Sequence, residues 1–297
     1  MSDSVIKPRF AIAAFTADLW QHVCPVIRIV QPLKQAGLLL IKGVQWIGGE
    51  LRVDPALICK ADIVLVARDF PRHVEAYEQV MEQARSLDKR VVYELDELLV
   101  ELPEEHPDYK YYLPARSAML RAILEADAII GSAPALCEYA RSFNPKTFVF
   151  PNYLADELWL LHSPAKETAG PVTIGYMGGQ SHACDLEPIE PLLMRIGQHY
   201  GDQVRLKFWG ITPPPALQDK PNVAWEIPNL VSYAEFIAYF LQQSCDIFLA
   251  PLNDNIFNRC KSHLKFLEYS ALGIPGIHSR ITTYESNQAW GKRPTGL

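Results

Sequence analysis

The amino-acid sequence predicts an α/β fold with two tandem domains, each a parallel sheet flanked by helices. Short apolar runs rich in β-forming residues alternate along the chain with longer amphipathic segments, which is the pattern of strands and crossover helices in parallel sheets. A stretch of polar and small residues over 166–170 separates two such series. With 297 residues, of which 49% are hydrophobic and 21% charged, the chain can form two hydrophobic cores.

The first series predicts one complete domain. Its strands are expected at 10–15, 37–49, 59–71, 89–99, 126–132 and 146–152. Its helices are expected at 26–35, 73–87, 115–125 and 134–143. Residues 102–114 interrupt the alternation with three Pro, an acidic cluster and three Tyr, and this composition predicts a surface loop.

The second series predicts another domain of the same kind. Its strands are expected at 172–177, 204–210, 222–227, 246–250 and 275–279. Its helices are expected at 186–200, at 233–243 and from about Lys261, with Gly273 ending the last helix and Pro275 just beyond it. We therefore predict domains at 1–165 and 166–297, with a ligand-binding cleft between them.

Residues 245–279 combine a strand, a polar loop, a helix and a second strand, and we expect ligand contacts in the loop. Ligands of open parallel sheets bind beyond the carboxyl ends of the strands, where the loop 253–261 with Asn258 would lie. The helix that follows carries Lys265 and Glu268 near its start. This arrangement predicts that the loop and the first turns of the helix form one site.

A diphosphate is the ligand that this helix start suits. Ser262 lies near the predicted N-terminus, whose free N–H groups attract anions, and Lys261 and Lys265 add positive charge. One turn further along the same helix face, Glu268 could accept hydrogen bonds from a ribose diol. The same spacing also occurs in a solvated ladder of ion pairs, so the helix by itself leaves both interpretations open.

A second candidate phosphate-binding feature follows the strand 172–177. Gly178 and Gly179 lie between that strand and a helix, the position at which glycines let a backbone approach phosphate. Ser181 and His182 add hydrogen-bonding groups there, and His182 is a candidate catalytic contact of the diphosphate or leaving group. Two glycines also occur in ordinary tight turns, and a histidine here could instead cap the helix or face solvent.

Asp96 is the candidate catalytic carboxylate of the first domain. It lies in the carboxyl-terminal part of the strand 89–99, where it could orient or deprotonate an acceptor hydroxyl or stabilise positive charge developing on a sugar. Another interpretation is a helix N-cap for residues 97–102. Further candidates near strand or turn ends are Arg28, Arg68 and Asp69.

Composition argues against several functional classes. A net charge of −6 without a Lys/Arg run disfavours nucleic acid as a partner. No Asp-x-Asp or His-x-x-x-His occurs, so we expect no metal site, and no motif calls for a cofactor. Six scattered Cys and the lack of a signal peptide favour free thiols in the cytoplasm. No apolar run reaches the roughly 20 residues of a membrane helix, which leaves peripheral membrane contact open.

Three segments resemble a known family. Residues 261–277, "KSHLKFLEYSALGIPGI", look like the donor-binding segment of GT-B glycosyltransferases of the type called glycosyl transferases group 1. Residues 175–186, "GYMGGQSHACDL", resemble the first turn of the family's donor domain, and residues 148–156, "FVFPNYLAD", the end of its N-terminal domain. The resemblance implies two Rossmann-like domains facing a cleft, with the nucleotide-sugar donor on the second and the acceptor on the first.

The resemblance also assigns roles and marks two departures. In the family, a Glu before a small-residue helix end and a Gly-x-Pro binds the nucleotide ribose, and the matching residue is Glu268. A second Glu usually precedes it with seven residues between the two, and Cys260 stands at that position. Further helices follow in the family where this sequence stops at Leu297, so the C-terminal end is expected to be short.

The function implied is a metal-independent, hexosyltransferase-like glycosyltransferase that moves a sugar from a nucleotide-sugar donor to a glycan, lipid or protein acceptor. Retention of anomeric configuration is expected because most relatives retain it. Cys260 and the early end favour an alternative, a non-catalytic GT-B-like partner subunit or glycan-binding protein. A third alternative is an epimerase that acts on a sugar nucleotide.

Overall fold

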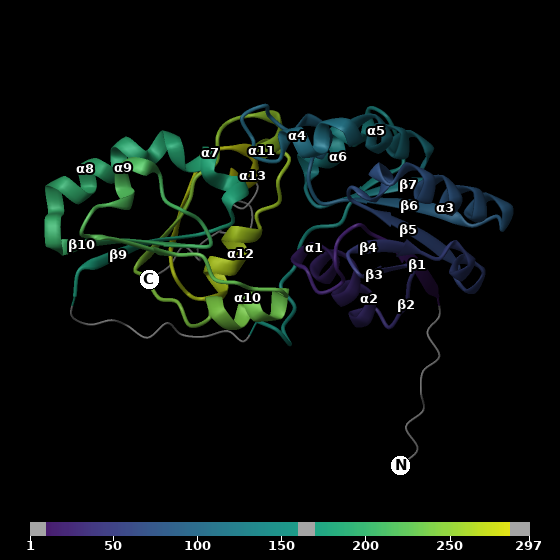
Figure 1. Ribbon diagram of the computed structural model, residues 1–297, viewed down its shortest axis with the longest axis horizontal. Coiled ribbons are helices and arrows are strands. Elements are labelled where there is room, and N and C mark those ends of the chain that lie inside the picture. The colour runs from purple at the N-terminus through teal and green to yellow at the C-terminus, as the bar shows by residue number, and fades with distance from the viewer. Residues whose placement is uncertain (1–9, 160–169, 286–297) are drawn as a thin grey trace, which may run out of the picture. The chain divides into compact units, whose positions relative to one another are not determined.

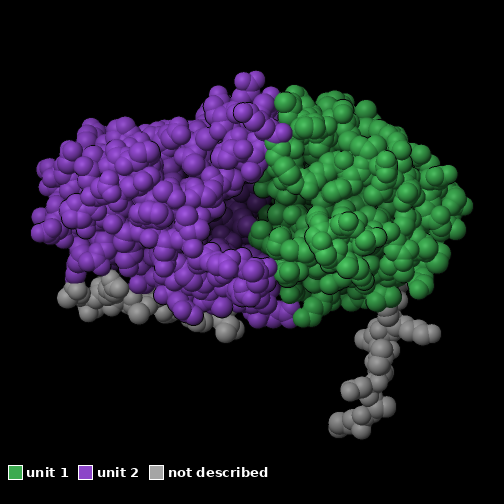
Figure 2. All heavy atoms as spheres, in the orientation of Figure 1, with its two compact units in different colours: residues 1–100, 111–152 green, residues 101–110, 153–297 purple. Residues whose placement is uncertain are grey.

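The structure is a computed structural model that describes residues 10–159 and 170–285 (Figure 1). The chain forms two compact units, which Figure 2 colours green and purple. Unit 1 consists of residues 1–100 and 111–152, and unit 2 of residues 101–110 and 153–297. The domain boundary predicted between residues 165 and 166 lies outside the described residues.

Unit 1 is built on a parallel sheet of six strands in the order β2-β1-β5-β6-β7-β8. Its strands are β1 (Ala11–Phe15), β2 (Leu39–Lys42), β5 (Ile63–Ala67), β6 (Arg90–Leu95), β7 (Ala128–Gly131) and β8 (Thr147–Val149). Its helices are α1 (Val23–Pro25), α2 (Gln31–Gln35), α3 (Val74–Ser86), α5 (Arg116–Glu125) and α6 (Pro134–Arg141). Residues Val26–Val30 join α1 to α2 as a π-helical turn. The parallel α/β organisation predicted for this half is confirmed.

The strand order of unit 1 reverses between β1 and β5. From β1 the chain crosses to β2 on one side, whereas β5, β6, β7 and β8 follow one another in the other direction. Right-handed crossovers in opposite directions place their helices on opposite faces of the sheet, and α1 and α2 lie on the face opposite α5 and α6 (Figure 1). Such a reversal opens a ligand-binding crevice at the carboxyl ends of the two strands.

The single strand predicted at 37–49 is wrong, because the chain forms β2 and then begins a separate hairpin. Strands β3 (Val44–Ile47) and β4 (Glu50–Val53) pair in antiparallel fashion. Gly48 and Gly49 form the two-residue turn with φ of +60° and +82°, the left-handed conformation that such turns require and that glycine adopts most easily. A Gly-Gly pair between apolar alternating segments is the sequence signal for this hairpin.

Unit 2 repeats the design with five parallel strands in the order β11-β10-β9-β12-β13. Its strands are β9 (Val172–Met177), β10 (Val204–Trp209), β11 (Val223–Glu226), β12 (Ile247–Ala250) and β13 (Gly276–His278). Its helices are α7 (Ala183–Leu186), α8 (Glu190–Tyr200), α9 (Pro215–Gln218), α10 (Tyr233–Phe240), α11 (Ile256–Arg259), α12 (Leu264–Ala271) and α13 (Thr282–Glu285). The order reverses between β9 and β12, and α8 and α10 lie on opposite faces (Figure 1).

Each face of the unit 2 sheet packs against its helices through large apolar side chains. On one face, Leu193 of α8 belongs to a buried cluster with Leu206 and Phe208 of β10. On the other, the rings of Phe248 and Tyr269 stack with centroids 4.2 Å apart. Burial of each such side chain contributes about 1.5–3 kcal/mol, so β12 and α12 are held firmly where the candidate site begins.

Two predicted loops contain helices. The segment 102–114 includes α4 (Tyr109–Tyr112), and Tyr112 is buried, so the prediction of a surface loop is wrong there. The loop 253–261 includes α11, because the side chain of Asn255 accepts a hydrogen bond from Asn258 N at 2.8 Å and caps it. Within residues 10–159 and 170–285, no helix has the length and apolar character needed to cross a bilayer.

Candidate functional site

Sequence-predicted site residues of unit 2 gather where its strand order reverses. The Gly178–Gly179 turn directly follows β9, and the segment 251–263 follows the neighbouring strand β12. Helix α12 then begins at Leu264 and carries Lys265 and Glu268. Because ligands of doubly wound sheets bind at such a reversal, the topology places these residues at the expected crevice of the unit.

The side chain of Lys265 packs against the Gly178 turn. Its Nζ donates a hydrogen bond to Met177 O at 2.6 Å and lies 5.1 Å from the centre of the Tyr176 ring. A Cβ on Gly178 would lie 2.7 Å from the Tyr176 hydroxyl and 2.9 Å from Lys265 Nζ, so a larger residue would displace both. Gly179, in contrast, is exposed and would tolerate a Cβ, which leaves its backbone open to a ligand.

Burial moves the pKa values of Lys265 and Glu268 towards physiological pH. It lowers the pKa of Lys265 to about 8, although the negative charge of Glu268 opposes the shift. It raises the pKa of Glu268, only 7% exposed, to about 7, although the positive charge of Lys265 opposes that shift. An anionic ligand near Lys265 would therefore restore charge balance to a group that pays a desolvation penalty without it.

The predicted helix start near Lys261 is wrong, since α12 begins three residues later. Lys261 and Ser262 lie in the connection between α11 and α12 and do not belong to the helix face of Lys265 and Glu268. Lys261 nevertheless reaches the site from this connection, because its Nζ lies 3.5 Å from His182 Nδ1. The same ammonium lies 4.7 Å from the centre of the Phe257 ring, a favourable cation–π contact.

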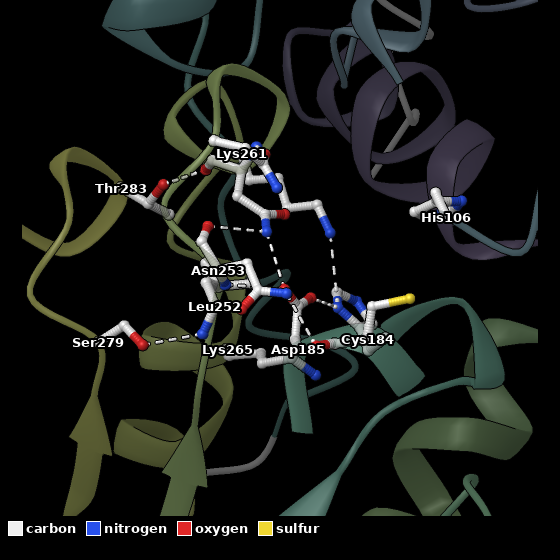
Figure 3. A network of polar contacts seen from close by, with 12 residues as sticks. His106, Cys184, Asp185, Leu252, Asn253, Lys261, Lys265, Ser279 and Thr283 are labelled. Atoms are coloured by element: carbon white, nitrogen blue, oxygen red, sulfur yellow. Dashed lines mark hydrogen bonds and ion pairs between the residues drawn. The ribbon is translucent and has the colours of Figure 1, made fainter. Parts of the chain in front are cut away.

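Asp185 of α7 connects the two sides of the site. Its Oδ1 accepts hydrogen bonds from Asn253 N at 2.9 Å and from Asn258 Nδ2 at 2.8 Å, while its Oδ2 lies 3.0 Å from His182 Nδ1 (Figure 3). Burial opposes ionisation, but the hydrogen bond from His182 and the charge of Lys261 hold the pKa of Asp185 below its ordinary value. Asp185 is therefore a buried carboxylate that fixes the loop after β12.

This pairing determines the hydrogen-bonding character of His182. An ionised carboxylate only accepts, so Asp185 requires the proton of His182 on Nδ1 and leaves a lone pair on Nε2. Burial and the positive charge of Lys261 lower the pKa of His182 to about 3. Within its unit, His182 is thus a neutral hydrogen-bond acceptor, which suits a hydroxyl group better than a phosphate oxygen.

Asn258 and Ser181 occupy supporting positions. The Asn258 side-chain amide donates to Asp185 Oδ1 at 2.8 Å and to Asn253 O at 3.0 Å. The backbone carbonyl of Asn258 accepts a hydrogen bond from Thr283 Oγ1. Both donor hydrogens of the amide are therefore used within the protein. Ser181 is half-buried in the 3₁₀ turn that follows Gly179.

Residues 101–110 complete the cluster from another part of the sequence. Cys184 Sγ donates to Glu105 O at 2.9 Å, and the ring of His106 meets the ring of Phe257 edge-on with centroids 5.4 Å apart. Burial and the charge of Lys261 lower the pKa of His106. The sequence predicted only a surface loop for this stretch and did not connect it with the cluster around Asp185.

In unit 1, Asp96 belongs to a cluster centred on Arg68. It directly follows β6, is 7% exposed, and its Oδ1 accepts a hydrogen bond from Arg68 Nε at 3.1 Å. Arg68 Nη1 donates to the Tyr112 hydroxyl at 3.3 Å and lies 3.7 Å from Asp18 Oδ2. Residues 97–102 form no α-helix, only a 3₁₀ turn at Leu99–Glu101, so the N-cap interpretation of Asp96 has no α-helix to cap.

Arg68 has an unusual backbone for its place between β5 and the following turn. Its φ is +52°, a left-handed conformation that costs a non-glycine residue of the order of 1–2 kcal/mol. The conformation directs the guanidinium into the group of carboxylates at the strand ends. Arg28, in contrast, is buried in an ion pair with Glu94 at 2.6 Å and serves the interior of unit 1.

Asp185 and His106 are candidate site residues that the sequence analysis did not name, and Asn253 was included only as part of the loop 253–261. His182 and Asp185 are three residues apart at a helix start, a spacing that brings side chains together and that could have identified the pair. Asn253 contributes its backbone N–H to Asp185 and its side-chain amide to Cys184 O at 2.8 Å, contacts that cross 68 and 69 residues of chain. Among the described residues, no three His, Cys, Asp or Glu side chains are arranged to hold a metal ion.

Solved structures are similar to this chain in fold, whereas sequence comparisons find no match. No protein-family model matches the sequence, and no curated protein is similar to it in sequence. The structure is similar to Anabaena HepE in complex with UDP-glucose, with 12% identity, coverage of 93% of this chain and 82% of that chain, and a TM-score of 0.61. An α-glucosyltransferase in complex with UDP and a 13-mer DNA matches with 11% identity, 92% and 81% coverage, and a TM-score of 0.60.

A third solved structure belongs to a different enzyme class. A putative UDP-N-acetylglucosamine 2-epimerase from Listeria monocytogenes matches with 11% identity, 94% and 81% coverage, and a TM-score of 0.52. Identities this low establish the fold and nothing finer. The predicted GT-B fold, an α/β chain with two parallel sheets in Rossmann-like arrangements, is thereby confirmed over most of the chain.

Proposed function

We propose that the protein is a glycosyltransferase that takes a sugar from a nucleotide-sugar donor held by unit 2. The observation that carries the proposal is the meeting of Lys265, Lys261 and the Gly178–Gly179 turn at the strand reversal of that unit. Two ammonium groups beside an open glycine backbone suit a diphosphate. The solved structures with bound UDP-glucose and UDP support a nucleotide sugar as the ligand class.

Each part of the nucleotide-sugar donor has a candidate partner in unit 2. The diphosphate would lie against the Gly179 backbone between Lys265 and Lys261, and Ser262 and Ser181 would border it. The ribose diol would donate to Glu268, which lies one turn further along α12 than Lys265. As the sugar leaves, the two lysines would stabilise the negative charge that collects on the diphosphate, so the proposed mechanism needs no metal ion.

His182 and Asp96 are the proposed catalytic residues. Neutral His182 would accept a hydrogen bond from a hydroxyl of the transferred sugar through Nε2 and so orient its reacting carbon. Asp96, held by Arg68, would orient or deprotonate the acceptor hydroxyl. Unit 1 would thus bind the acceptor, a glycan, lipid or protein, and the sugar would keep its anomeric configuration.

One observation favours a second function, that of a non-catalytic partner or glycan-binding protein. Cys260 stands where related glycosyltransferases carry a second Glu, and it is buried at 3% exposure. A buried thiol offers a donor sugar no charged contact. The similarity to an epimerase supports a further test, because an epimerase would convert the sugar nucleotide without any acceptor.

Calorimetric titration with UDP, GDP and ADP tests the donor site. We expect wild-type protein to bind one of the three, and Lys265→Met and Glu268→Gln each to weaken that binding about tenfold or more, since each removes a charged hydrogen-bonding partner. Lys220→Met and Glu75→Gln are matched controls, because both residues are exposed and lie outside the site. They should leave the affinity unchanged.

Two outcomes would count against the proposal. If the wild-type protein binds none of the three nucleotides, the partner-protein function is preferred. If it binds one but Lys265→Met and Glu268→Gln bind it as well as the controls do, the nucleotide site lies elsewhere.

A further inference from the structure

Residues 101–110 belong to unit 2 although the residues on both sides of them belong to unit 1. Two contacts attach the segment to the proposed donor site. Cys184 Sγ donates to Glu105 O at 2.9 Å, and the rings of His106 and Phe257 meet edge-on at 76° with centroids 5.4 Å apart. Figure 3 shows His106 on the side of the polar network towards which Cys184 points. A segment from the first half of the sequence thus borders the donor-binding cluster.

Local hydrogen bonding fixes the tautomer of His106. The backbone N–H of Asp108 donates to His106 Nδ1 at 3.1 Å, so Nδ1 is unprotonated and the ring proton lies on Nε2. The side chain is only 12% exposed, and its ring is held against Phe257. His106 therefore presents a fixed N–H donor, and a rigid donor loses little entropy when it binds a ligand.

The Lys261 ammonium and the His106 ring contact the same aromatic side chain, Phe257. Lys261 Nζ lies 4.7 Å from the centre of the same Phe257 ring, and 3.5 Å from His182 Nδ1. The charge of Lys261 and burial lower the pKa of His106, which keeps the ring neutral and its tautomer unchanged at physiological pH. Phe257 thus holds an ammonium and a neutral imidazole ring in one part of unit 2.

We propose that His106 is a further donor-binding residue whose Nε2–H donates a hydrogen bond to the distal half of the nucleotide sugar, either the β-phosphate or the transferred sugar. The inference rests on the proposed function of unit 2. Glu268 marks the ribose end of the ligand, and Lys261 lies before α12, towards its other end. His182 lies beside Lys261, and His106 shares its contact with Phe257. The two histidines would then supply one acceptor and one donor at the distal half.

Binding of UMP, UDP and UDP-glucose to four proteins tests this assignment. His106→Phe keeps an aromatic ring against Phe257 but has no N–H, whereas His106→Gln can replace the Nε2–H donor. His199→Phe is the matched control, because His199 is exposed on α8 and contacts only Tyr200 among the ring contacts of the described chain. Calorimetry of the full-length chains gives the affinities.

We expect His106→Phe to lose about tenfold in affinity for UDP-glucose, the effect of one hydrogen bond to a charged or sugar oxygen, with no loss for UMP. His106→Gln should recover most of the affinity, and His199→Phe should match the wild type. A loss that is already seen with UDP assigns the β-phosphate as the partner. A loss seen with UDP-glucose alone assigns the sugar.

The opposite results separate the two proposals. If His106→Phe binds UDP-glucose as tightly as the wild type, the role of His106 is overturned while the donor site stands. A loss that is equal for UMP, UDP and UDP-glucose, and that His106→Gln does not recover, would mean a general disturbance and would also overturn it. If the wild-type protein binds no UDP, GDP or ADP compound, the donor site and the role of His106 fail together.

Discussion

At the scale of single residues, Lys265 combines a structural contact with a proposed binding role. Its ammonium bonds the carbonyl of Met177 and supports the turn at Gly178, yet burial makes its charge costly. In the proposed donor site a bound anion would compensate this cost, and perturbed pKa values are common in ligand sites. The proposal therefore predicts a nucleotide affinity that depends on pH.

We predict that the affinity for UDP falls as the pH rises through about 8. The pKa of Lys265 is lowered to about 8 in the free protein, so the charged form that binds an anion is present below that pH and is lost above it. Between pH 8 and 9 the protonated fraction, and with it the affinity, should fall about fivefold. Calorimetry across this range measures the effect.

Lys265→Arg is the control for this pH dependence. A guanidinium stays charged throughout the range, so the variant should bind UDP equally well at pH 8 and 9. An alkaline loss of the same size in Lys265→Arg would assign the effect to another group and contradict the role of Lys265.

The sequence could reveal Lys265 and Glu268 because their spacing along one helix is a local property. It could not reveal how Asp185 is used, since the bonds from Asn253 and Asn258 cross 68 and 73 residues of chain. His106 was hidden for the same reason. Its neighbour Phe257 is remote in sequence, and no residue pattern connects the two.

At the scale of elements, the connection after β12 is the least regular part of the site, and a single carboxylate organises it. Asp185 accepts one hydrogen bond from the backbone of this connection and one from the side chain of Asn258. Ser279, which follows β13, accepts a further bond from Leu252 N at 2.8 Å (Figure 3). Apart from the four-residue helix α11, the loop is thus fixed by its neighbours.

We predict that Asp185→Ala lowers the free energy of unfolding by about 2–4 kcal/mol, because it leaves buried N–H donors without partners. Thermal and urea denaturation measure the change. Asp254→Ala is the matched control in the same loop, since the Asp254–Arg259 ion pair is exposed and surface pairs contribute little. Equal stability of Asp185→Ala and Asp254→Ala would show that the loop does not depend on Asp185.

The regular elements near this loop could be predicted, and the short ones could not. Strand β12 is an apolar run that stops at Pro251, which is a strong local signal. Helix α11 has only four residues and depends on the Asn255 cap, and the start of α12 is shifted by the turn before it. Short helices are decided by single caps and by tertiary contacts more than by periodicity.

At the scale of the whole molecule, the alternation of strands and helices was sufficient to predict two parallel α/β sheets. The strand orders, each with one reversal, cannot be read from periodicity, because a local pattern does not determine which strands become neighbours. The assignment of residues 101–110 to unit 2 could not be predicted either, because it depends on contacts between distant parts of the sequence.

We predict that UDP-glucose slows backbone hydrogen exchange in residues 101–110 as well as in 176–182 and 253–268. A ligand that binds only the closed form of these segments suppresses their local opening. Strand β5 in unit 1 serves as the internal control and should exchange at an unchanged rate. Protection confined to 176–182 and 253–268 would mean that residues 101–110 do not respond to the ligand.

The placement of residues 101–110 also decides how this polypeptide can be divided. The backbone passes between the two units three times, at 100/101, at 110/111 and at 152/153. A C-terminal half expressed alone from near residue 153 would therefore lack the contacts of Glu105 and His106. The matching N-terminal half would carry residues 101–110 without the unit that they contact. A recombinant C-terminal half, or a chimera that exchanges unit 2, would therefore have to include these ten residues.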